Sequence, residues 1–349
     1  MTVIGQNGVH SRLLWLALMI ILAAAAFCFD IKISKADHGE HSLRIVVADD
    51  VLVDYNKFLA DRDPLEITTF DGPHSRRDVV EVVLIQQALQ KGGWRGDVTL
   101  ISGGPYARMM QMIADGDADI TGSSTWLRDI EHRGDLVAAS SVVIPLGRFE
   151  AGFYMLADNP NRLKIRNLRS LQRLRGASNR NWKPDWQALG KLGLVDLIHV
   201  PAWDLMVQFV AEGRADFLLA PFQPGPDMEL VVDGVRMLPI PGYKIALDGS
   251  RHFAVTKNTP YSGDLIVAVD QGLSELQKIG RIEQAYRQSG FFHPAVKNWT
   301  MIGSDGFGQS NILPQHHALD QDNSMEMQIF SLRDRTGRLY PEASIFDPS

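Results

Sequence analysis

The sequence has a single cysteine, Cys28, among its 349 residues. That cysteine lies in an apolar N-terminal run, so a disulfide framework, a cysteine-ligated metal cluster and thiol catalysis are excluded for the rest of the chain. The sequence has no excess of basic residues either. It contains 35 lysines and arginines and 41 aspartates and glutamates, which gives a net charge of -6. A general nucleic-acid binder needs a basic surface, so we expect no nucleic-acid partner.

Motifs that carry enzyme chemistry are missing as well. The chain has no GxSxG, HExxH or CxxC sequence, no Walker loop and no Rossmann glycine triplet after a strand. Two histidine pairs, His38 with His41 and His316 with His317, stand in segments that read as a polar tether and a tail, where solvated histidines are the commoner case. "GSDGFG" (Gly303–Gly308) follows no clear strand and precedes no helix, so it is not a phosphate loop. We therefore expect no enzyme, no metal site and no cofactor.

The one long hydrophobic run is N-terminal. Leu13–Phe29 is an uninterrupted apolar stretch of 17 residues, slightly long for the core of a signal peptide and short for a membrane span. We interpret residues 1–36 as an export signal cleaved after Ala36, with a retained membrane anchor as the alternative. Lipoprotein attachment at Cys28 is a weaker option, because Phe27 stands where a small residue is expected. The body of the protein is then predicted to lie in the periplasm.

A nonapeptide recurs in the body of the chain. "MIADGDADI" (Met112–Ile120) returns as "FVAEGRADF" (Phe209–Phe217). The flanking features recur in order: a β-like run (Val98–Ile101 and Leu197–Val200), a proline suited to the first helical turn (Pro105 and Pro201), and a glycine just past the helix end (Gly116 and Gly213). Each copy predicts a β-α-β crossover. The spacing of about a hundred residues is the size of a domain, so the sequence predicts two similar α/β lobes.

The remaining segments fit this organisation. Leu43–Ala48 has the β-branched character of a strand buried on both faces, and Arg77–Lys91 has helical periodicity that ends at Gly92. Two strand-like runs in succession, Val137–Gly147 and Phe149–Ala157, break the alternation and predict the passage from one lobe to the next. Residues 249–292 close the ordered part with one strand and two helices. The tail, residues 301–349, carries too little periodicity to assign.

The order of five segments resembles a known family. They are "LRIVVA", "MIADGDADITGSS", "SLQRLRGASNRNW", "FVAEGRADFLLA" and "HFAVTKNTPYSGDLIVAVDQGLSELQKIGRIEQAY", and they span Leu43 to Phe292. Together they are similar to the bacterial extracellular solute-binding proteins of family 3, in a divergent branch that mostly lacks an assigned ligand and carries a "GRGW"-like loop, here "SNRNW" (Ser178–Trp182).

The resemblance implies an α/β fold of the type II periplasmic-binding class, in which each of two lobes is a mixed sheet flanked by helices. Two or three hinge strands would join the lobes, and a ligand would bind in the cleft between them. Lobe 1 would comprise residues 43–147 plus 252–300, and lobe 2 residues 148–251. The two nonapeptides would be equivalent parts of the two lobes.

Ligands of open α/β sheets bind beyond the carboxyl ends of the strands. The richest such segment is "GSSTWLR" (Gly122–Arg128), which resembles the family's SxTxxR segment. The resemblance implies that Arg128 holds a ligand carboxylate, with Arg133 as a competitor. The predicted ligand-binding residues are Asp49, Asp50, Tyr55, Ser123, Ser124, Thr125, Trp126, Arg128, Asn181, Trp182 and Phe222. For each aromatic residue, ordinary core packing is the competing interpretation.

Two departures from the family pattern weigh against a standard α-amino acid as the ligand. Pro221 and Phe222 stand where amino-acid binders have an aspartate for the ammonium group, and "GPHSRRD" (Gly72–Asp78) replaces an early "GFDVD"-like stretch. Asp49 or Asp50 offers a substitute charge. The aromatic residues suit a stacked or partly apolar small molecule.

The sequence thus predicts a monomeric periplasmic binding protein that captures a small polar or carboxylate-bearing molecule by hinge closure, for an ABC permease or a membrane sensor. One alternative is a dehydratase-like lyase on the same fold, for which Asp49, Asp50 and Glu150 are the candidate acids. Another is a sensory ectodomain tethered by Leu13–Phe29.

The fate of the N-terminal run can be measured directly. If residues 1–36 are an export signal, N-terminal sequencing of the exported protein should give a start near Asp37, because peptidases cut after small residues such as Ala36. A start that retains Leu13–Phe29 would support the tethered ectodomain instead.

Overall fold

The computed structural model describes residues 42–302 of the chain, which lie within the compact unit Met1–Gly308. The predictions made for residues 1–36, for the two histidine pairs and for the tail beyond Ile302 lie outside these described residues. Between residues 42 and 302, no helix combines the length and the apolar composition that crossing a bilayer requires.

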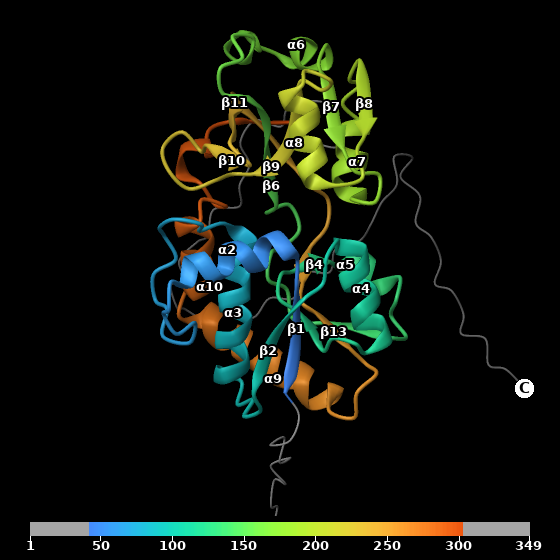
Figure 1. Ribbon diagram of the computed structural model, residues 1–349, viewed down its shortest axis with the longest axis vertical. Helices are drawn as coiled ribbons and strands as arrows, with labels where there is room; N and C mark the ends of the chain where they lie inside the picture. Colours follow the sequence, from blue (N-terminus) through green and yellow to red (C-terminus); the bar gives the residue numbers. More distant parts are fainter. Residues whose placement is uncertain (1–41, 303–349) are drawn as a thin grey trace, which may run out of the picture. The chain divides into compact units, whose positions relative to one another are not determined.

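The first of two large sheets has five strands in the order β2-β1-β3-β13-β5 (Figure 1). Its strands are β1 (Leu43–Val47), β2 (Val98–Ser102), β3 (Ile120–Thr121), β5 (Val137–Ala139) and β13 (Ala254–Thr256). β1 is parallel to β2 and β3, whereas β13 is antiparallel to β3 and β5. Because β13 comes more than a hundred residues after β5 yet pairs with it, the chain leaves this lobe and returns to it.

Helices cover both faces of this sheet. They are α2 (Asp49–Leu59), α3 (Arg77–Lys91), α9 (Ser262–Lys278) and α10 (Arg281–Gln288) on one side, and α4 (Tyr106–Asp115) and α5 (Leu127–Glu131) on the other (Figure 1). Successive residues of β1 serve the two faces. Ile45 and Val47 belong to the core that includes α3, and Val46 packs with Met109 and Ile113 of α4. The alternation explains why β1 has no polar side of its own.

The second sheet runs β10-β11-β6-β9-β7-β8, with β14 added beside β11. Its strands are β6 (Glu150–Leu156), β7 (Arg175–Ser178), β8 (Asp196–His199), β9 (Phe217–Pro221), β10 (Leu230–Val232), β11 (Val235–Ala246) and β14 (Thr300–Ile302). The helical segments are η1 (Arg162–Lys164), α6 (Leu168–Gln172), α7 (Lys183–Gly190), α8 (Trp203–Ala211) and η2 (Pro294–Val296). Parallel pairs (β7 with β8 and β9) and antiparallel pairs (β6 with β9 and β11) make this sheet mixed too. The predicted class, two α/β lobes with a mixed sheet each, is confirmed.

The repeated nonapeptides form the same contact in both lobes. In the first, the backbone N–H of Arg44 donates to Asp119 Oδ2 at 2.7 Å, and its guanidinium bonds Asp119 and the carbonyl of Gly116. In the second, the backbone N–H of Arg175 donates to Asp216 Oδ2 at 2.7 Å, and its guanidinium bonds Asp216 and the carbonyl of Gly213. Each last aspartate of the repeat therefore ties the end of its helix to the start of a neighbouring strand.

The glycines follow the C-terminal ends of α4 and α8 as predicted, whereas the prolines lie before the N-terminal ends of these helices and not inside their first turns. Gly116 and Gly213 have φ of 78° and 67°, the left-handed conformation that glycine adopts without strain. Pro105 lies one residue before α4, and Pro201 lies two residues before α8, rather than inside the first helical turns. Proline still suits both positions, because neither needs a backbone N–H donor, and Pro105 is extended with φ of -66° and ψ of 152°.

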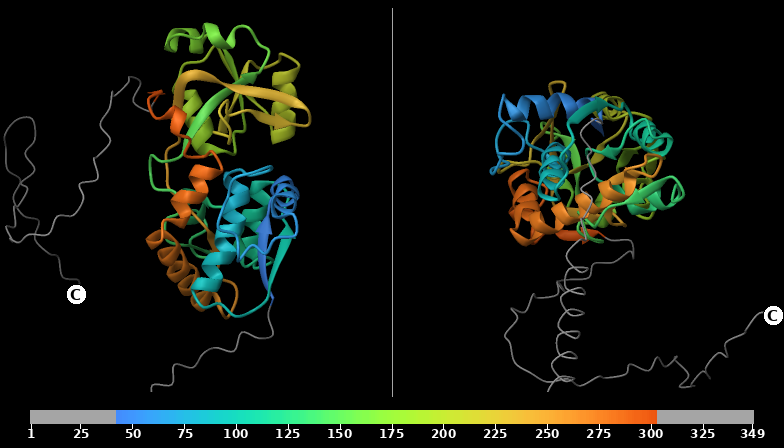
Figure 2. Two further views of the ribbon diagram at one scale, coloured as in Figure 1. Left: turned by 90° about the vertical axis from the view of Figure 1, so that its left-hand side faces the viewer. Right: turned by 90° about the horizontal axis from the view of Figure 1, so that it is seen from below.

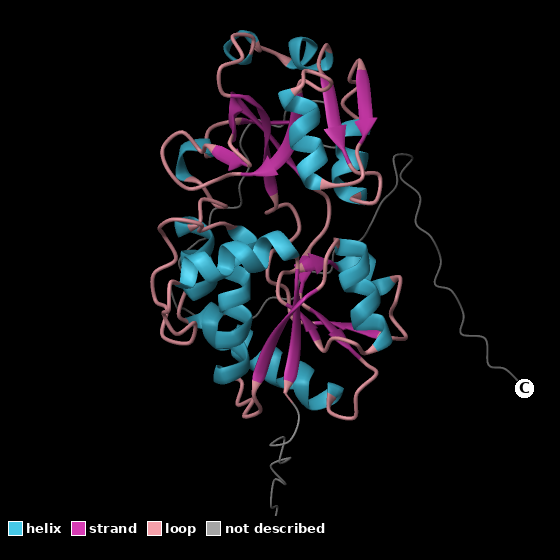
Figure 3. Ribbon diagram, in the orientation of Figure 1, coloured by secondary structure: helices cyan, strands magenta, loops and turns pink. Residues whose placement is uncertain are grey.

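Two chain segments cross between the sheets side by side, drawn mostly as loops in Figure 3. The run predicted as a strand from Val137 to Gly147 is a strand only over Val137–Ala139. Beyond it, residues 140–149 run antiparallel to residues 247–253, with a bridge between Ile144 and Arg251. The short strands β4 (Thr125–Trp126) and β12 (Arg251–His252) pair beside them. A third connection, residues 289–299, leads from α10 to β14.

Helices α3 and α9 lie against each other with their backbones almost in contact (Figure 2). A Cβ atom built on Gly272 of α9 would stand 1.8 Å from the carbonyl oxygen of Ala88 in α3, and one built on Gly92 would stand 1.7 Å from the carbonyl oxygen of Ala268. Only glycine fits at these two crossing points, so the helix pair cannot accept any side chain there without moving apart.

We expect Gly272→Ala to lower the free energy of unfolding by about 1–3 kcal/mol, because the added methyl forces the two helices apart. Urea unfolding of the variant and the wild type measures this loss. Gly263→Ala is the matched control in the same helix, since no atom lies within 4 Å of its added Cβ. Equal stability of Gly272→Ala and wild type would contradict the close packing of α3 on α9.

Candidate functional site

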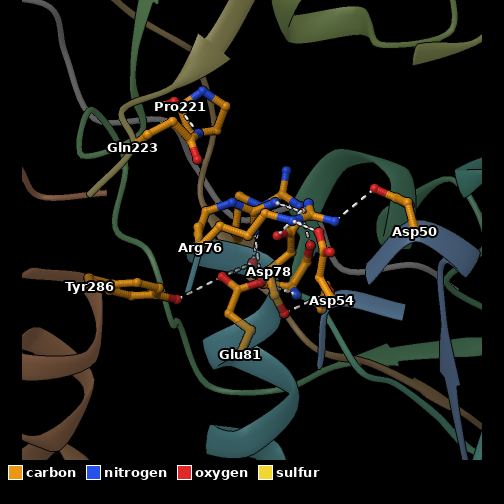
Figure 4. Close-up of polar contacts among 12 residues, drawn as sticks. Asp50, Asp54, Arg76, Asp78, Glu81, Pro221, Gln223 and Tyr286 are labelled. Carbon is orange, nitrogen blue, oxygen red and sulfur yellow. Dashed lines mark hydrogen bonds and ion pairs between the residues drawn. The ribbon is translucent and has the colours of Figure 1, made fainter. Parts of the chain in front are cut away.

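Glu81, one turn inside α3, is a fully buried carboxylate. Four donors satisfy it: Arg77 Nη1 at 2.7 Å, the backbone N–H and the hydroxyl of Ser124, both at 2.8 Å, and the hydroxyl of Tyr286 at 2.8 Å (Figure 4). These residues come from α3, from the loop before β4 and from α10. One carboxylate thus joins three separate parts of the first lobe, and such a group is stable when buried because every lone pair has a donor.

Ser124 connects this carboxylate to a buried arginine on a crossing segment. While its hydroxyl donates to Glu81, the same oxygen accepts from Nε of Arg251 at 3.1 Å, and its carbonyl accepts from Nη2 of Arg251. The Arg251 guanidinium lies over the ring of Trp126 at 4.6 Å and over the ring of Phe149 at 5.2 Å. Arg77 lies over Phe149 as well, at 5.4 Å. Two guanidinium groups and two aromatic rings therefore pack together.

Arg251 has no counter-ion of its own in the part of the chain that the structure describes. The residue is 7% exposed, and no carboxylate of residues 42–302 lies within ion-pair distance of it. Burial, followed by repulsion from Arg77, lowers the pKa of Arg251 to about 10, so the guanidinium is still charged at neutral pH. Glu81 acts on it from beyond Ser124 but makes its direct ion pair with Arg77. The cluster thus carries one buried cation that a small anion would neutralise.

Arg76, by contrast, is fully neutralised. It contacts Asp50 at 2.8 Å, Asp54 at 3.0 Å and Asp78 at 2.8 Å (Figure 4). Although burial opposes the charged form, these three carboxylates together raise the pKa of Arg76 above its ordinary value. The pKa of Asp78 is lowered by Arg76 and Arg77 despite its burial. This neighbouring group ties α2 to the start of α3, and its carboxylates leave the Arg76 guanidinium without charge to offer a ligand.

Asp185, on the second lobe, interacts electrostatically with both arginines. It lies in the first turn of α7, and it forms no ion pair with any other residue between 42 and 302. Burial raises the pKa of its carboxyl from 3.8 to about 6, and its own backbone N–H, Arg251 and Arg77 act in the opposite direction. Asp185 is therefore a carboxyl of the second lobe that interacts electrostatically with Arg77 of the first lobe and with Arg251 of the crossing segment.

Five of the predicted binding residues lie in or beside this cluster. Ser124 and Trp126 contact Arg251, as described. Asp50 pairs with Arg76, and the Ser123 hydroxyl donates to the carbonyl of Asp78 at 3.3 Å. Thr125 stands next to them, and its hydroxyl donates to the carbonyl of His252 at 3.2 Å. The segment "GSSTWLR" therefore contacts Arg251 through Ser124 and Trp126.

The other predicted residues lie elsewhere. Asp49 accepts from Ser102 and from the backbone of Gly104, and buried Tyr55 accepts from Gln86 at 2.7 Å. Arg128 is exposed on α5, and none of its side-chain nitrogens bonds another described residue. Asn181 is exposed and Trp182 packs 6.4 Å from Trp203. Phe222 is 1% exposed and packs on Trp299, which is the core role that was its competing interpretation.

The cluster also contains residues that the sequence analysis did not single out as binding residues: Arg77, Glu81, Phe149, Asp185, Arg251 and Tyr286. A signal was present for two of them. Arg77 and Glu81 stand four residues apart at the start of an apolar helix, the spacing of an ion pair on one helix face. Nothing in the sequence near Arg251 points to Ser124, which is 127 residues away. Within the described part of the chain, no three histidine, cysteine, aspartate or glutamate side chains are grouped as a metal site would need.

Comparison with known proteins places the fold. No protein-family model and no curated protein matches the sequence. Among solved structures, an ancestral arginine-binding protein is 14% identical, with 73% of this chain and 100% of that chain covered and a TM-score of 0.45. The amino-acid transporter binding protein YtmK of Bacillus subtilis is 14% identical (60% and 86% covered, TM-score 0.44). The periplasmic VFT2 domain of BvgS from Bordetella pertussis is 14% identical (70% and 93% covered, TM-score 0.44).

The resemblance to solute-binding proteins thus recurs among solved structures, at low identity and with TM-scores below 0.5. A likeness at this identity concerns the fold alone, and it does not say what this chain binds.

The raised pKa of Asp185 predicts a pH dependence of stability. Between its ordinary pKa of 3.8 and about 6, the folded protein binds a proton at Asp185 more tightly than the unfolded chain does, so this group makes the free energy of unfolding fall as pH rises through that window. Asp185→Asn should remove the fall and gain about 1–3 kcal/mol relative to wild type by neutral pH. Urea unfolding at several pH values measures the difference.

The control is Asp204→Asn, an exposed aspartate in the first turn of the neighbouring helix α8. Its difference from wild type should stay within about 0.5 kcal/mol and should not grow with pH. A parallel pH profile for wild type and Asp185→Asn would show that the Asp185 carboxyl is solvated.

Proposed function

We propose that the protein is a binding module that captures a small carboxylate-bearing molecule between its two lobes. The observation that supports this most is Arg251, a buried guanidinium held between two aromatic rings without a counter-ion among the described residues. Leaving such a charge uncompensated costs several kcal/mol. A ligand carboxylate would supply the missing charge.

The geometry around Arg251 suits a carboxylate. Its Nε and Nη2 are directed to Ser124, while Nη1 donates to no described residue, so donors remain for a ligand oxygen. Trp126 and Phe149 offer apolar surface to the rest of a small molecule. Arg77 lies close enough to add positive potential, because it lowers the pKa of Arg251.

The position of Arg251 links binding to lobe movement. Its backbone pairs with Ile144 on the other crossing segment, so a ligand held by Arg251 is held at the hinge. Asp185 belongs to the second lobe and reaches the arginines only when the lobes are near each other. A ligand with a carboxylate for Arg251 and a polar group for Asp185 would gain both contacts in the closed form alone, which shifts an open–closed equilibrium toward closure.

The wider assignment follows the family resemblance. We propose that residues 1–36 direct export to the periplasm, that lobe 1 comprises residues 43–147 plus 252–300, and that lobe 2 comprises residues 148–251. The monomeric protein would pass its ligand to an ABC permease or present it to a membrane sensor. Arg128, exposed at the start of α5, stays as the alternative carboxylate anchor.

A dehydratase-like lyase is the second candidate function, and one observation favours it. The Asp185 carboxyl has a pKa of about 6, which suits a general acid or base near neutral pH. The acids first considered for that role are occupied elsewhere. Asp49 accepts from Ser102, Asp50 pairs with Arg76, and Glu150 pairs with Lys244 at 2.7 Å. A lyase would therefore have to work through Asp185.

The anchor can be tested with matched variants. Thermal-shift screening of carboxylic acids, amino acids and other metabolites first identifies a ligand, which at about 100 times its dissociation constant adds about 2.7 kcal/mol of stability. Calorimetric titration should then show Arg251→Met binding that ligand about ten- to a hundredfold more weakly or worse, because charge-assisted hydrogen bonds are lost. Methionine fills similar apolar space between the two rings, so we expect the variant to fold.

Arg128→Ala and Arg133→Ala are the controls. Both should bind within about threefold of wild type, and a loss confined to Arg128→Ala would identify Arg128 as the anchor instead. Incubating the ligand with a small amount of protein and following it by NMR separates the two functions. An unchanged ligand supports binding alone, and turnover that Asp185→Asn abolishes would identify a lyase.

A further inference from the structure

A basic stretch in the second lobe is not used by the proposed binding site. Residues 159–184 contain eight lysines and arginines and not one aspartate or glutamate, in a chain whose net charge is -6. Most of these cations fall on η1, α6 and the residues around them. A local excess of positive charge in a protein of negative net charge indicates a surface that binds a negatively charged partner.

The stretch folds so that its apolar residues point inward and its cations outward. Ile165 and Leu171 are buried, and Leu168 packs against the same core. Lys164, Arg166, Arg169 and Arg173 are exposed, and Leu163 is 54% exposed among them. Arg169 and Arg173 are four residues apart at α6, so they share one side of it. We call Leu163, Lys164, Arg166, Arg169 and Arg173 the basic tip.

The four cations of the tip have no ion pairs with residues 42–302. Other arginines of the same stretch are engaged: Arg175 pairs with Asp216 at 2.9 Å, and Arg162 donates to the carbonyl of Pro239 at 3.2 Å. Of the tip residues only Lys164 makes a side-chain hydrogen bond to another described residue, the amide oxygen of Asn161 at 3.2 Å. Four like charges within ten residues repel one another, so the arrangement lowers stability until an anionic surface covers it.

The tip has the composition of a membrane-surface contact. Arginine binds phosphate with two parallel hydrogen bonds, and three of the four cations are arginines. An exposed leucine beside them offers an apolar side chain to the boundary between headgroups and acyl chains. In Figure 1 and in the left view of Figure 2, α6 lies at the end of the second lobe that is opposite the crossing segments. At that end of the lobe, α6 and the residues around it can contact a broad flat surface such as a membrane.

We propose that the basic tip docks the second lobe onto an anionic phospholipid surface. Phosphate groups pair with Lys164, Arg166, Arg169 and Arg173, and Leu163 enters the interface. The attraction is electrostatic and therefore falls with salt. The contact is independent of the ligand site, since no tip residue takes part in the cluster around Arg251.

Cosedimentation of the exported protein with vesicles tests the proposal. Vesicles of phosphatidylcholine alone are compared with vesicles that hold phosphatidylglycerol as about a third of their lipid. The tip variant replaces Lys164, Arg166, Arg169 and Arg173 with glutamine. It should lose more than about a hundredfold in partitioning to the anionic vesicles. The control variant replaces four exposed cations elsewhere, Lys57, Lys91, Arg95 and Lys297, with glutamine and should bind like wild type.

A second readout reports the tip itself, even if an N-terminal anchor holds the protein on every vesicle. An environment-sensitive fluorophore is attached at Leu163→Cys in protein that also carries Cys28→Ser. Its emission should rise with the anionic vesicles only, and the rise should vanish at about 0.5 M salt and with the four glutamines. An unchanged signal on anionic vesicles, or equal binding by tip and control variants, overturns the proposal and leaves an acidic protein as the partner to seek. Thermal unfolding of each variant confirms that it is folded.

Discussion

The candidate site depends on one buried carboxylate, that of Glu81. It receives donors from α3, from the loop before β4 and from α10, and it is fully excluded from solvent. A buried charge is tolerated only when its hydrogen bonds are complete, so these three parts of the fold must arrive together. Ser124 then has its hydroxyl fixed by Glu81, and the same oxygen is left to accept from Arg251. The arrangement of the arginines follows from the position of Glu81.

That arrangement divides the charges into two classes. Arg76 is surrounded by three carboxylates and serves the packing of α2 on α3. Arg251 is buried with hydrogen bonds to Ser124, and no carboxylate of residues 42–302 pairs with it. The difference matters because a neutralised arginine has nothing left to offer a ligand. Arg251 also stands on a segment that crosses between the sheets, paired there with Ile144 of the other crossing segment. Asp185 of α7 adds a carboxyl group that interacts electrostatically with Arg251 and Arg77.

Much of the fold could be predicted from local patterns. Arg77–Lys91 was expected as a helix and is α3 over that range, and the glycines at 116 and 213 end their helical turns as expected. The repeated nonapeptides were expected to be equivalent parts of the two lobes, and Asp119 and Asp216 make matching contacts. Their hydrogen bonds to Arg44 and Arg175 were not predicted. The site was predicted less well. Ser124 and Trp126 meet the arginines, whereas Tyr55 and Phe222 are core residues and Arg128 stays a prediction.

The sequence by itself determined the two α/β lobes and the segment "GSSTWLR" near the strand ends, because hydrophobic periodicity, turn glycines and repeats act over a few residues and remain visible in the linear chain. Only the tertiary structure decided which charges are free. Ser124 meets Arg251 across 127 residues, and Glu81 meets Tyr286 across 205. Whether an arginine is neutralised depends on such distant partners and on burial. The residues next to it in the sequence indicate neither of these.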